Sequence, residues 1–450
     1  MRLDDPVVVL GGGLAGMGVA WTLARGGFRD VTVVERGAEL GGLAGTITED
    51  ERFYPLAYHH ILHRDRTLLY TLDALGALAR VRWRRIRMLF RSSSAFYDLS
   101  RPWDFLRFPM SLPDKLRFAR LMLRCFRTSD WEAWHEASAA ELVDAWGGPG
   151  VRRAIFEPLT RLKFDLPCHE VSGAWLGARL HFREGSAPLG YIPGTNWTKV
   201  LCEGLAGELE KYRVRVRLGV AVERLERARG RVHEVVLGDG SRLAAATVVS
   251  TLPVETYRAL APDDDTPALA AIRYSAIVSA LFVTAQPTTP DFYWMNLPTL
   301  DLNASGVFRL ESLNPTIGAP GESCFNFVSH RPGRTDPFLS RDDATLLAGY
   351  REDFRRIFGF EIEPRWSRLT RIPLYSPVFV RGYRNPPLRS SVLENVYFAG
   401  NYRTFPSIAS TGTALESGFE AGEAILRASG RASGLPQELE RFRPPAQLRG

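Results

Sequence analysis

The chain has 450 residues, which is too long for one simple hydrophobic core and predicts two or three domains. Its 45% hydrophobic and 24% charged residues are ordinary for a globular protein and exclude a largely disordered chain. The formal net charge is +7, but no nucleic-acid-binding module is visible, so we expect no nucleic acid among the partners.

A glycine loop between a predicted strand and a predicted helix opens the chain. The apolar run Val7–Leu10 precedes the loop, and a helix-compatible segment, Met17–Arg25, follows it. Three glycines have the G-x-G-x-x-G spacing: Gly11, Gly13 and Gly16. Such glycines permit a tight turn, close approach to a pyrophosphate and close helix–strand packing. A second apolar run, Val31–Val34, ends at Glu35, which is placed to bind ribose hydroxyls. This order predicts a dinucleotide-binding unit.

A second glycine pair, Gly41 and Gly42, follows Glu35. The combination resembles the signature of the flavoprotein group that contains amine oxidases, protoporphyrinogen oxidases, phytoene desaturases and UDP-galactopyranose mutases. The resemblance implies FAD, with the glutamate on its ribose and the glycine pair along its pyrophosphate. Many members have Arg after the pair, where this chain has Leu43. The implied FAD contacts in this part are Gly11, Gly13, Leu14, Ala15, Gly16, Glu35, Arg36, Gly41, Gly42 and Leu43.

Residues 80–91 hold the densest cluster of arginines. Arginine alternates with other residues from Arg80 to Arg84, which is typical of a strand with one basic face. One interpretation is capture of an acidic or phosphorylated substrate, with Arg84 and Arg85 as candidate contacts. Attraction to an anionic membrane and a merely solvated strand face are the two alternatives.

A helix is predicted for residues 111–126, because Ser111 and Pro113 provide helix-entry chemistry before an apolar periodicity. Four apolar positions fall on one face: Leu116, Ala119, Leu123 and Phe126. Arginines crowd the other face, so the helix either lies on a membrane surface or covers a domain core. Further helices are expected over residues 139–146 and 151–162. This region resembles the helical cap of protoporphyrinogen oxidases and plant-type phytoene desaturases.

The chain is expected to return to the cofactor domain at residues 189–195. Related flavoproteins place a strand near residues 214–225 whose backbone contacts adenine, and the resemblance assigns that contact to Val222. Residues 232–246 predict a β-hairpin with an Asp-Gly turn. Residues 270–375 mix strands with a helix near residues 342–358 and complete a substrate domain.

Near the C-terminus, a predicted strand ends at a glycine and a helix begins near Thr413. In the same flavoprotein group, such a strand end contacts the ribityl-phosphate region of FAD. The helix start points at the O2 side of the flavin ring, where its partial positive charge stabilises an electron-rich group. The matching positions are Gly400, Asn401, Thr411, Gly412, Thr413 and Ala414.

Together these segments predict an α/β fold, with a Rossmann-like FAD-binding domain of the GR2 flavoprotein type. We expect this domain in three segments, residues 1–53, 189–260 and 386–430. A helical cap and substrate domain, residues 54–188, and a second α+β substrate segment, residues 261–385, interrupt it. Residues 431–450 form a tail.

Three kinds of chemistry fit these motifs. The order His60-Ile-Leu-His63 looks like the histidine motif of UDP-galactopyranose mutases, which act on a sugar nucleotide, and makes His60 the candidate catalytic residue. An oxidase or desaturase would instead pass hydride from an apolar substrate to flavin N5. Residues 371–375 look like the late segment of protoporphyrinogen oxidases and make Tyr375 a candidate substrate contact. Six aromatic residues would supply apolar surface in the cap: Trp103, Phe105, Phe108, Trp131, Trp134 and Phe156. Many amine oxidases use a lysine of the later substrate domain to hold a water near flavin N5. No lysine follows Lys211 in this chain, so the resemblance disfavours an amine oxidase.

We therefore expect an FAD-dependent oxidoreductase that desaturates or oxidises an extended or polycyclic apolar small molecule. A mutase-like enzyme that acts on a sugar nucleotide is the alternative, and a non-catalytic FAD-binding protein is the third hypothesis. The four cysteines are widely separated and predict neither disulfides nor a zinc site, and no metal is expected. No apolar stretch has the roughly 18 residues of a membrane-spanning helix. A cytoplasmic location is expected, with peripheral contact at the inner face of the membrane and a homodimer left open.

Overall fold

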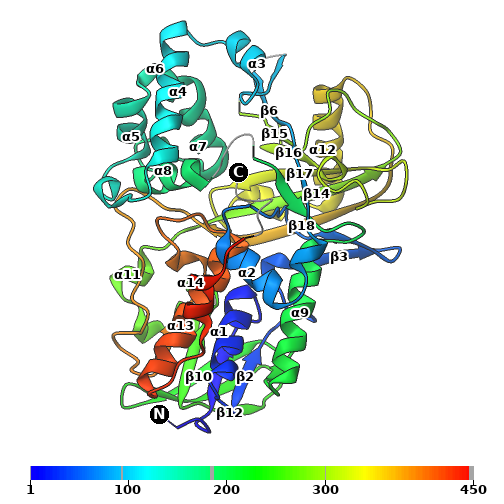
Figure 1. The fold of residues 1–450 in the computed structure, drawn as a ribbon. Coiled ribbons are helices and arrows are strands. Elements are labelled where there is room, and N and C mark those ends of the chain that lie inside the picture. The colour runs from blue at the N-terminus through cyan, green and yellow to red at the C-terminus, as the bar shows by residue number, and fades with distance from the viewer. Residues whose placement is uncertain (1, 93–94, 183–186, 299–300, 445–450) are drawn as a thin grey trace.

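The computed structural model describes residues 2–92, 95–182, 187–298 and 301–444. At one end of the molecule lies a five-stranded parallel sheet with the order β19-β13-β1-β2-β9 (Figure 1). Its strands are β1 Val7–Leu10, β2 Val31–Val34, β9 Arg215–Arg217, β13 Thr247–Ser250 and β19 Val396–Phe398. Strands β1, β2 and β13 are buried at every position, as expected of a parallel sheet covered on both faces. The α/β fold class is confirmed.

Two helices that are far apart in sequence, α1 Leu14–Arg25 and α13 Thr411–Ala428, lie side by side on this sheet (Figure 1). Glycines let their backbones approach. A Cβ atom added at Gly418 would lie 2.3 Å from the carbonyl oxygen of Ala15, and one at Gly422 would lie 2.6 Å from the Thr22 side chain. The close packing fixes the N-termini of α1 and α13 relative to each other. Helices α2 Arg66–Ala74 and α9 Trp197–Lys211 complete this part of the domain.

A mixed seven-stranded sheet with the order β18-β14-β17-β16-β15-β6-β7 forms the second layer. Its strands are β6 Met88–Ser92, β7 Ala95–Tyr97, β14 Tyr274–Thr284, β15 Trp294–Asn296, β16 Gly306–Arg309, β17 Ser323–Arg331 and β18 Pro364–Pro377. The helix α12 Asp343–Phe358 packs on this sheet through Leu346, Tyr350 and Phe354. This helix was predicted.

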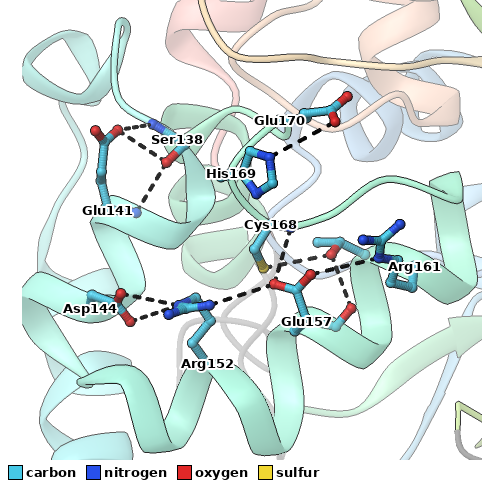
Figure 2. Close-up of polar contacts among 10 residues, drawn as sticks. Ser138, Glu141, Asp144, Arg152, Glu157, Arg161, Cys168, His169 and Glu170 are labelled. Carbon is cyan, nitrogen blue, oxygen red and sulfur yellow. Dashed lines mark hydrogen bonds and ion pairs between the residues drawn. The ribbon is translucent and has the colours of Figure 1, made fainter.

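The cap lies at the opposite end of the molecule from the parallel sheet (Figure 1). Its helices are α3 Pro102–Arg107, α4 Leu112–Arg127, α5 Ala139–Trp146, α6 Pro149–Val151, α7 Glu157–Phe164 and α8 Gly173–Phe182. A π-helical turn over residues 152–156 divides the helix predicted for residues 151–162. Arg152 Nε donates to both carboxylate oxygens of Asp144, at 2.9 and 3.1 Å, and its guanidinium lies 3.8 Å from Glu157 (Figure 2). Arg152 therefore joins α5 to α7 across the π turn.

Smaller elements connect these layers. They are the ribbon β3 Thr46–Glu49 with β4 Arg52–Pro55, the pair β5 Arg82–Arg84 with β8 Leu189–Tyr191, the sheet β10 Val222–Ala228, β11 Arg231–Leu237 and β12 Arg242–Ala244, and the helices α10 Val254–Leu260, α11 Pro267–Ala270 and α14 Leu435–Arg441. The predicted hairpin at residues 232–246 is confirmed as β11 and β12. Among the described residues, no helix has both the length and the apolar character needed to cross a bilayer.

Three local predictions are wrong. The first is the start of the basic strand expected over residues 80–84: a 3-10 turn ends at Arg80, so the strand is β5 alone and begins at Arg82. The arginines turn to separate partners, since Arg82 donates to the carbonyl oxygen of Ala79 and Arg91 to that of Ile357. The basic face of β5 is therefore limited to Arg82 and Arg84, and Arg91 of β6 does not extend it.

The second correction concerns residues 214–225, where the sequence suggested one strand. The chain bends between β9 and β10, because Gly219 adopts a φ of +70°. The backbone N–H of Gly219 donates to the carbonyl oxygen of Gly37 at 2.8 Å, and that of Val220 donates to Glu35 at 3.2 Å. The bend places the start of β10 beside the end of β2.

The third correction concerns the cap. For the apolar face of α4, a membrane surface and a domain core were the two alternatives, and the core is wrong: the face points to solvent, with Leu116 67% exposed and Leu123 48% exposed. The buried side of α4 carries Leu121 and Cys125 instead. Of the cap aromatic residues, Trp131 and Phe156 are packed in the core, whereas Trp103 is 69% exposed.

Candidate active site

The glycine loop between β1 and α1 has the conformation that its sequence predicts. Gly11 has a φ of +103°, and a Cβ atom added at Gly16 would lie 1.9 Å from the carbonyl oxygen of Gly11. A Cβ atom at Gly13 would meet nothing within 4 Å. No side chain caps the start of α1, so its first N–H groups are directed into this open space. The loop therefore fits the pyrophosphate of a dinucleotide.

The second glycine pair lies directly against this loop. Gly41 donates its backbone N–H to the carbonyl oxygen of Gly12 at 2.8 Å and forms an isolated parallel bridge with Gly13. Gly42 has a φ of +56°, and its added Cβ atom would lie 3.1 Å from the Cα atom of Gly13. Side chains at either position would fill the space beside the loop. Leu43, which follows the pair, packs against the substrate-sheet core, and Ala15 is buried at the start of α1.

Glu35 directly follows β2, and backbone N–H groups orient both of its carboxylate oxygens. It accepts hydrogen bonds from the N–H of Gly12 at 2.7 Å and from the N–H of Gly37 at 2.8 Å. Each oxygen retains a lone pair for a ribose hydroxyl. The bend before Val222 runs beside Glu35, so the structure brings these two predicted contacts together, whereas Arg36 is exposed.

The C-terminal motif meets the same end of the sheet. Gly400 has a φ of +141° and donates its N–H to the Ser417 hydroxyl at 2.9 Å, which ties β19 to α13. The Oδ1 atom of Asn401 is buried without a hydrogen-bond partner among the described residues. An orphaned buried amide oxygen is costly unless a ligand donates to it. A ribityl hydroxyl would supply such a donor, so Asn401 fits FAD.

Asp65, which we did not predict as a site residue, caps the start of α2 and contacts the start of α13. Its carboxylate accepts from the N–H of Leu68 at 3.1 Å and from the Ser410 hydroxyl at 3.4 Å. A Cβ atom added at Gly412 would lie 1.8 Å from Asp65 Oδ1, so only glycine fits there. Burial raises the pKa of Asp65 to about 6, against the opposing effect of Leu68, Ser410 and Gly412. Asp is a typical N-cap, so the start of α2 was readable from sequence, but the contact with α13 was not.

At the start of α13, Ser410 and Thr413 form a capping box. The Ser410 side chain accepts from the Thr413 N–H, and the Thr413 hydroxyl accepts from the Ser410 N–H at 2.9 Å. The helix begins at Thr411, two residues before the predicted start, and Ala414 is buried in its first turn. The carboxylate of Asp65 therefore lies against the N-terminus of α13, the same helix end that the resemblance assigns to the flavin.

The histidine segment joins the cofactor domain to the seven-stranded sheet. Tyr58 stacks on Phe308 of β16, with ring centroids 3.9 Å apart, and Phe308 stacks on Trp294 of β15 at 5.0 Å. His60 Nδ1 lies 3.5 Å from the Tyr293 hydroxyl. Burial lowers the pKa of the neighbouring His59. The candidate catalytic histidine thus stands beside an aromatic stack, which we call the Tyr58 stack: Tyr58, Phe308 and Trp294.

Of the predicted substrate contacts, Tyr375 on β18 joins this region. Burial and the adjacent Tyr58 raise the pKa of Tyr375 well above its usual range, and Arg179 opposes that rise. Arg84 is half-buried in β5, whereas Arg85 is exposed. The pair β5–β8 borders the histidine segment, since Gly190 of β8 bridges to Ile61.

Comparisons with known proteins agree with this geometry. A model of the family described as flavin containing amine oxidoreductase matches residues 14–426. The chain is 21% identical to the 15-cis-phytoene desaturase of Solanum lycopersicum over 94% of its own length and 77% of that protein. The putative protoporphyrinogen oxidase of Exiguobacterium sp. 255-15 superimposes with a TM-score of 0.76 at 18% identity, over 94% of this chain and 99% of the other. Reduced UDP-galactopyranose mutase gives a TM-score of 0.70 at 13% identity, over 99% of both chains.

Proposed function

The chain belongs to the flavin-containing amine oxidoreductase family and is an FAD-dependent oxidoreductase, and from this premise we propose that it removes hydride from an apolar, extended or polycyclic small molecule. When bound, FAD supplies the hydride acceptor at flavin N5. The observation that carries the proposal is the Tyr58 stack, which places three stacked aromatic rings where the cofactor domain meets the substrate sheet. Hydride removal from carbon depends on such positioning more than on an acid–base pair.

We assign the cofactor to groups that converge on the ends of β1, β2 and β19. The glycine loop and the Gly41–Gly42 pair would hold the pyrophosphate, Glu35 the ribose, the start of β10 at Val222 the adenine, and Asn401 the ribityl chain. The start of α13 would face the flavin ring. We propose the domain limits given above for the rest of the chain, with α2 assigned to the cofactor domain because it packs against α13.

Anaerobic mixing of the FAD-loaded protein with candidate polyenes and reduced tetrapyrroles tests the proposal. Bleaching of the oxidised flavin absorbance, with formation of one carbon–carbon double bond per flavin reduced, is the expected result. Absence of bleaching with every apolar candidate, in protein that holds FAD, would contradict it.

The histidine motif supports a mutase-like enzyme as the alternative, since His60 lies beside Tyr293 next to the Tyr58 stack. Turnover of UDP-galactopyranose only after prior reduction of the flavin would establish this alternative. His60→Ala should then abolish turnover, whereas His169→Ala, a substitution at a 71% exposed cap side chain, should not change it.

We also propose that the cap rests on an anionic membrane. Five of the nine exposed large hydrophobic side chains among the described residues gather on α3 and α4: Trp103, Leu106, Leu112, Leu116 and Leu123. We call them the α3–α4 surface. Leu112, Leu116 and Leu123 are spaced to share one stripe of α4. Exposed arginines flank this surface: Arg101, Arg107, Arg120, Arg124 and Arg127. An apolar stripe edged by arginines matches the interface of a membrane with anionic headgroups.

A further inference from the structure

Cationic side chains of the cap face the substrate sheet next to the Tyr58 stack. Lys163 lies on α7, Arg179 on α8 and His330 on β17. Figure 1 shows α7 and α8 at the side of the cap that faces this sheet. The cations Lys163 and Arg179 both act electrostatically on His330, and Arg179 also acts on Tyr58 and Tyr375. We call Lys163 and Arg179 the cation cluster, and His330, whose ring is neutral, lies beside it.

Among the described residues, Arg179 has no counter-charge. In the part of the chain that the structure describes, no hydrogen bond or ion pair engages its guanidinium, which lies 5.7 Å from the ring centroid of Trp175. Lys163 Nζ lies at the same distance, 5.7 Å, from the Trp175 ring. Burial lowers the pKa of Arg179, and only the Tyr58 and Tyr375 hydroxyls oppose this effect. A half-buried guanidinium without an anion is costly, and an anionic ligand would offset that cost.

Beside the cluster, His330 has a buried ring nitrogen without a hydrogen-bond partner among the described residues. The Ser305 hydroxyl donates its hydrogen to the carbonyl oxygen of Val328 at 2.8 Å, so His330 Nδ1, 2.8 Å from Ser305 Oγ, must be the donor in that contact. The Nε2 atom is therefore the acceptor of the neutral ring, and it is buried without a hydrogen-bond partner among the described residues. Burial, together with Lys163, Arg179 and Arg331, lowers the pKa of His330 to about 3.

The cap holds the two cationic helices firmly. Arg152 ties α7 to α5, and the Glu157 carboxylate accepts from the backbone N–H of Cys168 at 3.3 Å, in the loop that leads to α8 (Figure 2). The cap fold thus fixes the two helices that carry Lys163 and Arg179.

We propose that the cation cluster binds a carboxylate or phosphate group carried by an otherwise apolar substrate, with Arg179 as the principal contact. The inference rests on the proposed function, because it places the apolar part of the same molecule on the Tyr58 stack. It narrows the substrate class from apolar small molecules in general to amphiphiles with one anionic end.

Calorimetric titration of the FAD-loaded protein, with the flavin difference spectrum recorded in parallel, tests this inference. The probes are decanoate, decyl phosphate, neutral decanol and inorganic phosphate. Decanoate or decyl phosphate should bind at least about tenfold more tightly than decanol. Whichever anion binds more tightly identifies the group, and binding of inorganic phosphate alone would assign the cluster to a free phosphate.

The variants Arg179→Gln and Arg161→Gln provide the matched comparison. Arg161 lies on α7, has a 55% exposed side chain and pairs with Glu157 at 3.7 Å, so its variant should bind the anions like the wild type. Arg179→Gln should lose about tenfold or more in anion affinity while decanol binding stays unchanged. Arg179→Lys, which keeps the charge, should recover part of the loss and serves if the glutamine variant does not fold.

Equal binding of decanoate, decyl phosphate and decanol, or unchanged anion binding in Arg179→Gln, would overturn the inference. The two proposals fail separately. Anion binding through Arg179 without flavin bleaching by any substrate would overturn hydride removal alone. If a neutral polyene bleaches the flavin and the protein binds decanoate, decyl phosphate and decanol equally, only the role of the cation cluster as a substrate contact is overturned.

Discussion

The Glu35 carboxylate accepts a 2.7 Å hydrogen bond from the backbone N–H of Gly12, within the glycine loop itself. Its other oxygen accepts from the N–H of Gly37. The acid at the end of β2 is therefore part of the loop that follows β1, and its orientation is fixed before a ligand arrives. The preorganised carboxylate gains affinity because little side-chain entropy remains to be lost.

Glu35→Ala should weaken FAD binding by about 10- to 100-fold, because charge-assisted hydrogen bonds to the ribose and the order of the loop are lost together. Quenching of flavin fluorescence during reconstitution measures the dissociation constant. Glu39→Ala, at an exposed acid four residues on, is the control and should bind FAD normally. Equal affinities of the two variants would contradict the assignment.

Gly418→Ala should destabilise the protein by about 1–3 kcal/mol, since the new Cβ atom would lie 2.3 Å from the Ala15 carbonyl oxygen and push α13 from α1. Thermal unfolding at saturating FAD measures the change. The control is Gly207→Ala on α9, where a Cβ atom meets nothing within 4 Å and alanine should stabilise the helix by up to about 1 kcal/mol. A neutral Gly418→Ala would show that the two helices are not tightly packed.

Leu116→Ser combined with Leu123→Ser should reduce binding to vesicles that contain phosphatidylserine by at least about tenfold, because two side chains no longer enter the interface. Co-sedimentation measures binding, and added salt should weaken it for the wild type. Leu218→Ser, at a 44% exposed leucine of the other domain, should bind like the wild type. If the double variant instead dissociates a homodimer in solution, the α3–α4 surface contacts a second copy and not a membrane.

Asp65→Asn should change how stability depends on pH. The folded-state pKa of about 6 lies above the value of roughly 4 for an unfolded chain, so the folded protein binds the extra proton. The free energy of unfolding should therefore fall as the pH rises from about 4 to about 6, and the variant should lose this dependence. Urea unfolding at saturating FAD across this range measures it. Asp73→Asn, at an exposed acid of the same helix, should retain the wild-type profile, and an identical profile for Asp65→Asn would contradict the prediction.

The four cysteines, all buried and free, should not react with thiol reagents in the native protein at about pH 8. Burial raises the pKa of Cys125 to about 12 and that of Cys168 to about 11, so almost no thiolate is present. Titration with Ellman's reagent should find four thiols only after denaturation. Rapid labelling of the native protein would show that the core opens.

The cofactor half of the site could be predicted because its signals are local. The spacing of Gly11, Gly13 and Gly16, with Glu35 at the end of the next strand, is dictated by backbone geometry within one βαβ unit. The Gly41–Gly42 pair and the strand that ends at Gly400 belong to the same kind of signal. Each residue type is required by a turn or a close approach that involves its own neighbours.

The substrate half could not be predicted in this way. Helical periodicity identified an apolar face on α4 but not whether it meets a core or solvent, and the fold turned Leu116 outward. The arginines of residues 80–91 divide between two sheets, so the basic face is limited to Arg82 and Arg84 of β5. Neither pattern states which partner a side chain will meet.

The sequence by itself determined the nucleotide-binding unit, the α/β class and the flavoprotein family, because these depend on spacings between near neighbours. Only the tertiary structure placed Asp65 against Gly412, and Arg179 beside the Tyr58 stack without an anionic partner among the residues that the structure describes. These relationships join segments more than a hundred residues apart. Burial and loss of counter-charge are properties of the packed molecule, and no local pattern encodes them.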